Sequence, residues 1–134
     1  MNPLTLEIGL RTAGLVLSGL VVANFFAASR WRYAENLAGA DNMVRQIFYV
    51  HCGYLISVIA GLALLCLGWP EFLMEGKMSR ALCGFFGLFW GSRVVVQLTC
   101  YDKELRRADR GWDVFFFGVF LFLAAVFTLA AIYQ

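Results

Sequence analysis

Charged residues are scarce in this sequence. Only 15% of the 134 residues are Asp, Glu, Lys or Arg, whereas 61% are hydrophobic, and the mean hydropathy is +0.72. A soluble domain of this length cannot bury so much apolar surface, and exposing that surface to water would lead to aggregation. The shortage of charge therefore excludes an ordinary soluble domain and favours an integral membrane protein.

Motifs for metal, nucleotide and redox chemistry are also lacking. The sequence contains one histidine, His51, and no CxxC or CxxCH pattern, phosphate-binding loop or zinc motif. No metal site is expected, no cofactor can be assigned, and a net charge of +2 spread through short loops gives no indication of nucleic-acid binding. Cys66 and Cys83 lie at similar depth near the same end of consecutive apolar segments. A disulfide can form there only in an oxidising compartment, and buried free thiols are favoured.

Four apolar segments account for the high hydropathy. They cover residues 8–29, 47–69, 81–101 and 114–133, and each has about the 20 residues that a helix needs to cross a bilayer. Backbone polar groups in lipid must bond within their own segment, which selects helices. The sequence predicts an all-α protein, a single transmembrane domain over residues 1–134 built as a four-helix bundle.

Basic residues near the ends of the segments predict the orientation. Three lie on the side that carries the termini: Arg11, Lys77 and Arg80. Seven lie in the first and third loops: Arg30, Arg32, Arg45, Lys103, Arg106, Arg107 and Arg110. This bias places both termini outside and these loops in the cytoplasm, with a bacterial inner membrane as the expected location.

A few polar side chains lie inside the apolar segments, and Arg93 is the most costly of them. An arginine within a span costs about 2.5–3.5 kcal/mol on insertion scales. At a rise of 1.5 Å per residue, Arg93 is about 12 Å along the helix axis from Tyr101, and His51 is about 9 Å along the axis from Arg45. These depths match, and Gln97 shares the face of Arg93. The candidate binding residues are Arg93, Gln97, His51, Asn24, Tyr54 and Trp90.

A pocket of this kind combines a fixed cation, amide donors, an imidazole and aromatic walls. It suits an amphipathic ligand with an anionic or carbonyl head and an apolar tail, such as a lipid or a quinone. The alternative is that Arg93 extends to the headgroups and binds lipid phosphate there. His51 could serve as a general base, but no partner residues complete a catalytic set, so the sequence assigns no reaction.

Local patterns give further expectations about packing. Small residues at 53, 57 and 61 and at 84, 87 and 91 form two stripes, which we expect to pack against each other. The fourth segment carries no charge after Asp113 and is expected to be the most lipid-exposed. The spacings of Glu7 with Arg11 and of Asp102 with Arg106 each predict an ion pair along a helix.

The arrangement of segments and four residues resemble the MAPEG family of small membrane-embedded glutathione-dependent enzymes. Arg45 and His51 at the start of the second helix, and Arg93 followed by Tyr101 in the third, resemble that family's conserved positions. The Asn and Glu that follow the family's histidine are replaced here by Cys52, Gly53 and Tyr54, and the histidine of its third helix by Val96 and Gln97. The resemblance implies outer termini, a trimer and a glutathione site that opens to the cytoplasm between protomers.

Three functions therefore compete at the level of sequence. The leading hypothesis is binding of a lipid-like small molecule in the cytoplasmic half of the bilayer. The second is a MAPEG-like glutathione-dependent transferase. The third is a membrane anchor for haem or quinone, or a purely structural subunit of a larger complex. A homo-oligomer or another partner in a membrane complex is compatible with each of them.

Overall fold

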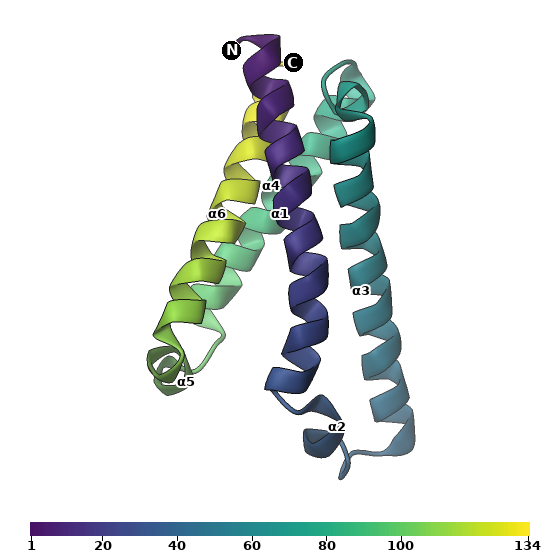
Figure 1. Cartoon of the computed structure of the whole chain (residues 1–134), viewed down its shortest axis with the longest axis vertical. Helices are drawn as coiled ribbons and strands as arrows, with labels where there is room; N and C mark the ends of the chain where they lie inside the picture. The colour runs from purple at the N-terminus through teal and green to yellow at the C-terminus, as the bar shows by residue number, and fades with distance from the viewer.

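The computed structural model describes residues 1–134, apart from the side chain of Leu105. Four long helices dominate it: α1 (Pro3–Arg30), α3 (Asn42–Gly68), α4 (Lys77–Thr99) and α6 (Arg110–Ile132) (Figure 1). Three short elements connect them: α2 (Tyr33–Asn36), the 3-10 turn η1 (Pro70–Leu73) and α5 (Lys103–Ala108). All four long helices are long and apolar enough to cross a membrane. The predicted all-α, four-helix membrane architecture is confirmed.

Each long helix begins about one turn before the apolar segment that predicts it. Asn2 starts α1, and its side chain accepts a hydrogen bond from the Leu4 amide at 3.0 Å. Asp41 caps α3 in the same way through the Met43 amide at 2.9 Å. These side chains satisfy amide groups that have no partner inside the helix, so the helices extend into the polar interface.

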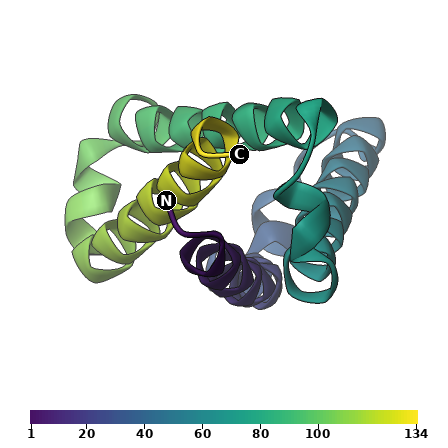
Figure 2. The same ribbon diagram turned by 90° about the horizontal axis from the view of Figure 1, so that it is seen from above.

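Helices that follow each other along the chain pack as two pairs. The first pair is α1 with α3, the second is α4 with α6, and α1 also contacts α6 (Figures 1 and 2). The expectation that the glycine stripes of α3 and α4 pack together is wrong. A Cβ added at Gly87 on α4 would lie 2.6 Å from Thr128 Oγ1 on α6, whereas Gly53 and Gly61 on α3 have no neighbour within 4 Å.

The fourth long helix, α6, is more central than its composition suggests. It contacts both α4 and α1, so the expectation that it is the most lipid-exposed helix is wrong. Its shortage of polar residues reflects burial against two helices as well as contact with lipid. The buried residues of α6 are Phe120, Leu123, Val126, Phe127 and Ala130.

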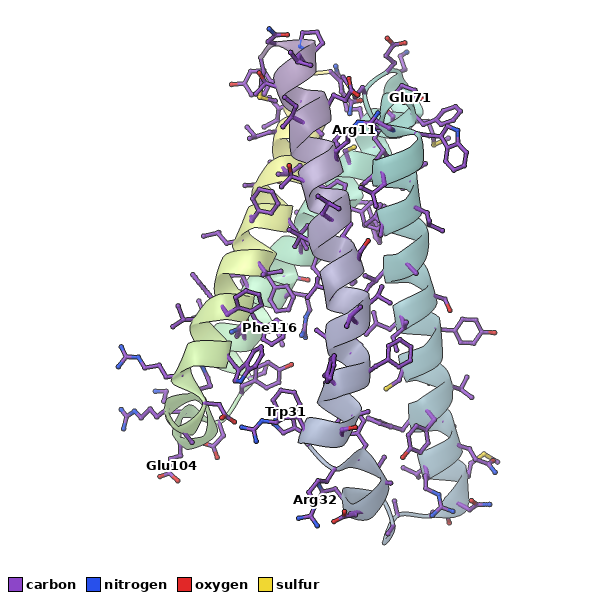
Figure 3. All side chains as sticks on the ribbon, viewed as in Figure 1. Arg11, Trp31, Arg32, Glu71, Glu104 and Phe116 are labelled. Atoms are coloured by element: carbon purple, nitrogen blue, oxygen red, sulfur yellow. The ribbon has the colours of Figure 1, made fainter. Side chains whose placement is uncertain are left out.

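The two ends of the bundle carry the polar groups. Both termini lie at one end, and Arg11 and Glu71 lie there too, whereas Trp31, Arg32 and Glu104 lie at the opposite end (Figures 1 and 3). The predicted pair of Arg11 with Glu7 is present, at 2.9 Å. Polar ends on either side of an apolar middle fit a chain that crosses the membrane four times.

The two cysteines expected near one end of neighbouring helices are both buried. Cys66 on α3 and Cys83 on α4 are free thiols with no solvent exposure. Gln134 reaches this region, and its side-chain nitrogen lies 3.5 Å from Cys83 Sγ. The interpretation as buried free thiols agrees with this arrangement.

Candidate functional site

The candidate site is centred on Arg93, which lies two turns from the end of α4 nearest α5. Its guanidinium carbon lies 5.0 Å from the centre of the Phe120 ring on α6, which is cation–π distance. Nη1 donates a hydrogen bond to the Tyr101 hydroxyl at 3.3 Å. The side chain is half-buried, so the packing of α4 on α6 holds it in place.

Within the described part of the chain, Arg93 has no anionic partner, although it lies inside the apolar part of α4. Four arginines form ion pairs with a carboxylate, and among the side chains that the structure describes Arg93 forms none. Neither the Tyr101 hydroxyl nor the Phe120 ring neutralises the charge. The paired arginines are Arg11, Arg30, Arg32 and Arg106.

Gln97, one turn further along α4, joins this helix to the start of α6. Its Nε2 donates to the backbone oxygen of Asp113 at 2.7 Å and to Asp113 Oδ1 at 2.8 Å. Arg106 binds the same carboxylate through Nε and Nη2, both at 3.1 Å. Such two-pronged, charge-assisted pairs are among the stronger hydrogen bonds in proteins. This partly buried network fixes the α4–α6 geometry beside Arg93.

The expected ion pair between Asp102 and Arg106 is not formed, because Asp113 takes the guanidinium. Asp102 instead accepts the Glu104 amide at 2.8 Å at the start of α5. Asp113 is partly buried and fixed by Gln97, which makes it the better partner. One feature of the sequence indicates this network. Asp113 is a lone carboxylate at the start of an apolar segment, and it lies at the same depth as Gln97 across a short loop.

Trp90 forms the deep side of the candidate site. Its ring stacks on Phe120, with centroids 5.8 Å apart and an interplanar angle of 16°. Phe120 stacks in turn on Phe116 at 6.1 Å, and Phe116 on Trp112 at 6.1 Å. This aromatic ladder runs along α6 and reaches α4 at Trp90. The aromatic wall expected near Arg93 therefore comes mainly from α6.

Tyr33 on α2 packs against the first half of α3. Burial and, to a lesser degree, the neighbouring Cys52 and Tyr101 side chains raise the pKa of the Tyr33 hydroxyl. Its ring packs edge-on against Phe48 at 5.3 Å. Nothing in the spacing of Tyr33 in the sequence indicates its contact with Phe48.

The other three candidate residues lie apart from Arg93 and bond only to their own helices. His51 is exposed on α3, and its Nδ1 lies 2.8 Å from the Ile47 oxygen. Tyr54 on the same helix is 73% exposed. Asn24 on α1 donates to the Leu20 oxygen at 2.8 Å. The structure thus groups Trp90, Arg93 and Gln97 on one helix and leaves His51, Tyr54 and Asn24 on two others.

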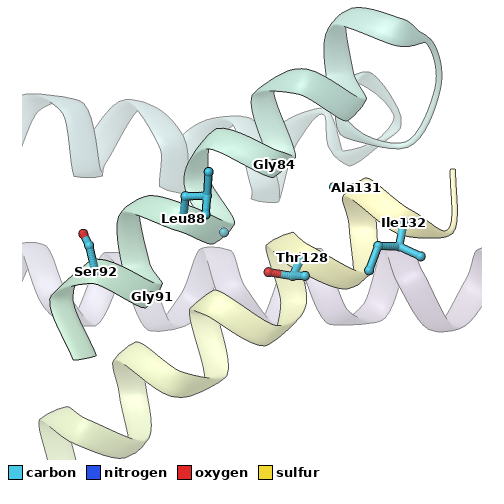
Figure 4. A pocket seen from close by; sticks show the side chains of 8 residues that line it. Gly84, Leu88, Gly91, Ser92, Thr128, Ala131 and Ile132 are labelled. Atoms are coloured by element: carbon cyan, nitrogen blue, oxygen red, sulfur yellow. The ribbon is translucent and has the colours of Figure 1, made fainter. Parts of the chain in front are cut away.

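A surface groove lies along the α4–α6 pair. It has a volume of about 480 Å³ and is mostly apolar (Figure 4). A second groove, of about 380 Å³, lies between α1 and α6. Neither is lined by Arg93 or His51, and no group of three metal-ligating side chains occurs in the part of the chain with described side chains. The first groove is lined by Gly84, Gly87, Leu88, Gly91, Ser92, Thr128, Ala131 and Ile132.

Comparison of the chain with family models, with characterised proteins and with solved structures gives no match.

Proposed function

We propose that this multi-pass membrane protein binds an amphipathic molecule with an anionic or carbonyl head, such as a lipid or a quinone, at Arg93. The observation that carries this proposal is a half-buried arginine inside a membrane-spanning helix with no carboxylate beside it. The positive-inside bias places this site in the cytoplasmic half of a bacterial inner membrane, with both termini outside.

The electrostatics favour an external anion. The charge on an arginine inside a span costs about 2.5–3.5 kcal/mol on insertion scales, and Arg93 cannot lose its proton to avoid that cost. A cation–π contact and one hydrogen bond to a neutral hydroxyl offset only part of it. A phosphate, carboxylate or polarised carbonyl on a ligand head would supply the missing interaction, while the ligand's apolar tail lies along the exposed, apolar faces of α4 and α6.

The test is to measure which lipids stay bound to Arg93→Gln by native mass spectrometry after gentle purification. Arg107→Gln is the matched control, because it removes the same charge from an exposed residue outside the spans. We expect Arg93→Gln to lose anionic lipid or quinone and Arg107→Gln to keep it. Equal retention by the unmodified protein and both variants would refute the proposal.

Glutathione-dependent chemistry is the second candidate, favoured by one contact. Arg93 and Tyr101, two of the four positions that carry the MAPEG resemblance, are joined by a hydrogen bond. The other two, Arg45 and His51, bond within α3. Titration of the purified protein with glutathione discriminates between the candidates. Absence of binding at millimolar concentration removes the transferase hypothesis and leaves lipid binding untouched.

A further inference from the structure

Two buried polar atoms on α4 have no hydrogen-bond partner, and both lie on the side of the helix that carries Arg93. Trp90 and Gln97 are each only 3% exposed. Trp90 Nε1 and Gln97 Oε1 lack a partner within the described part of the chain. Unpaired buried groups cost about 1–3 kcal/mol each and are rare in folded proteins. Two of them beside an arginine without a counter-ion point to a ligand.

The order of these groups along the helix is informative. Gln97 lies nearest the membrane surface on the α5 side, Arg93 is one turn deeper, and Trp90 is almost one turn deeper again. Trp90 and Gln97 are seven residues apart, which gives about 10 Å along the axis and nearly the same direction around it. From the surface inward, the protein therefore offers a hydrogen-bond acceptor, a cation and a hydrogen-bond donor.

We infer that the face of α4 formed by Gln97, Arg93 and Trp90 binds one ester-linked, anionic glycerophospholipid whose head group carries a hydroxyl. The hydroxyl donates to Gln97 Oε1, the phosphate pairs with Arg93, and an ester carbonyl accepts from Trp90 Nε1. This inference rests on the proposed function and names the ligand class for the same site. A phospholipid in a bilayer presents these groups in this order of depth, and a quinone carries neither the phosphate nor the hydroxyl.

Trp90 Nε1 and Gln97 Oε1 are buried in this structure, and the hydrogen bonds of Arg93 and Gln97 indicate how a lipid can reach them. Arg93 lies between the two unpartnered residues along α4 and makes one side-chain hydrogen bond, at 3.3 Å, to an exposed tyrosine. That bond is long for a guanidinium and is readily exchanged for phosphate. Binding at Trp90 Nε1 and Gln97 Oε1 requires a side chain that covers them to move, and the weakly held Arg93 side chain is the candidate. Gln97 keeps its position because its nitrogen remains bonded to Asp113.

The carbonyl contact is tested by changing the lipid and the protein together. The probes are phosphatidylglycerol with ester-linked chains and its ether-linked analogue, which lacks the carbonyl oxygens, each titrated into delipidated protein in detergent and measured by native mass spectrometry. We expect the unmodified protein to bind the ester lipid about fivefold to tenfold more tightly, the size of one hydrogen bond. Trp90→Phe keeps an aromatic ring against Phe120 but lacks the N–H, so this ratio should fall to about one.

The hydroxyl contact is tested with phosphatidylmethanol, which has the same charge and ester chains but no head-group hydroxyl. The unmodified protein should prefer phosphatidylglycerol by a similar factor, and Gln97→Met should remove that preference. Glycerol phosphate, which lacks the chains, should not displace the lipid. If it does, the site takes a free phosphate and the inference fails.

The outcomes separate this inference from the proposed function. If Arg93→Gln loses all anionic lipid but the ester-to-ether ratio is the same in the unmodified protein and Trp90→Phe, the proposed function stands and this inference is overturned. If the unmodified protein binds none of the probes, the inference is overturned as well. The inference is supported if the ester-to-ether ratio falls to about one in Trp90→Phe and the preference for phosphatidylglycerol over phosphatidylmethanol is lost in Gln97→Met.

Discussion

Gly87 is a position of close approach between α4 and α6, and replacing it with alanine should separate them. An added Cβ would lie 2.6 Å from Thr128 Oγ1, 3.2 Å from the Thr128 amide nitrogen and 3.4 Å from its Cα. A side-chain oxygen can rotate away, but the backbone atoms cannot move unless the helix moves. Overpacking of this kind costs about 1–3 kcal/mol. Alanine regains up to about 1 kcal/mol through its higher helix propensity. We therefore expect a net loss of about 1–2 kcal/mol.

The matched control is Gly91→Ala, one turn further along the same helix. Nothing lies within 4 Å of a Cβ added there, so only the propensity gain applies and stability should stay equal or rise slightly. Thr128→Ala should reduce the cost of Gly87→Ala without abolishing it, because it removes Oγ1 and leaves the backbone contact.

The assay for the three single variants and for the Gly87→Ala/Thr128→Ala double variant is denaturant unfolding in mixed detergent micelles, followed by tryptophan fluorescence. Equal losses for Gly87→Ala and Gly91→Ala would refute the close approach of the two helices. A cost of Gly87→Ala that does not change in the Thr128→Ala background would refute the role assigned to the hydroxyl.

Three further predictions concern other contacts. Gly14→Ala should destabilise the α1–α3 pair by about 1–3 kcal/mol, because a Cβ there would lie 2.7 Å from a leucine Cγ on α3, while Gly19→Ala has free space and should be neutral in the same unfolding assay. Asp113→Asn removes the charge that holds two side chains and should cost about 1–3 kcal/mol; unfolding identical to that of the unmodified protein would contradict the network. Cys83 is fully buried and Cys100 is exposed, so a membrane-permeant maleimide should modify Cys100 first, with mass spectrometry locating the adduct; faster labelling of Cys83 would contradict its burial.

The elements of this fold were predictable from sequence because hydropathy reports directly on whether a helix can sit in lipid. Segment 47–69 has few alternatives to a spanning helix, and the structure places α3 across it. Helix ends were less predictable, because the capping residues Asn2 and Asp41 lie outside the apolar run.

The pairing of the helices was not predictable in the same way. A stripe such as Gly84, Gly87 and Gly91 shows that a helix can approach another closely, but it does not specify the partner. Thr128 is that partner, and it stands in a segment whose composition resembles a lipid-facing helix.

The sequence predicts how deep the candidate residues lie in the membrane, but it does not predict the direction in which their side chains point. Sequence spacing places His51 and Arg93 at similar levels, yet the faces that α3 and α4 bury turn the two side chains apart. Gln97 and Trp90 stay with Arg93 because all three lie on α4 within two turns. Asp113 joins the site from the start of α6, where spacing carries little information about contacts.

The pairing of consecutive helices also bears on how the chain is made. Since α1 contacts α3 and α4 contacts α6, each pair can form as soon as its second member enters the membrane. Until α6 arrives, however, Gln97 has no Asp113 to bind, and α4 carries an unpaired amide and an unpaired guanidinium into the lipid. The arrival of α6 therefore completes the α4–α6 pair, and truncation before residue 110 should leave α4 exposed to the cell's quality control for membrane proteins.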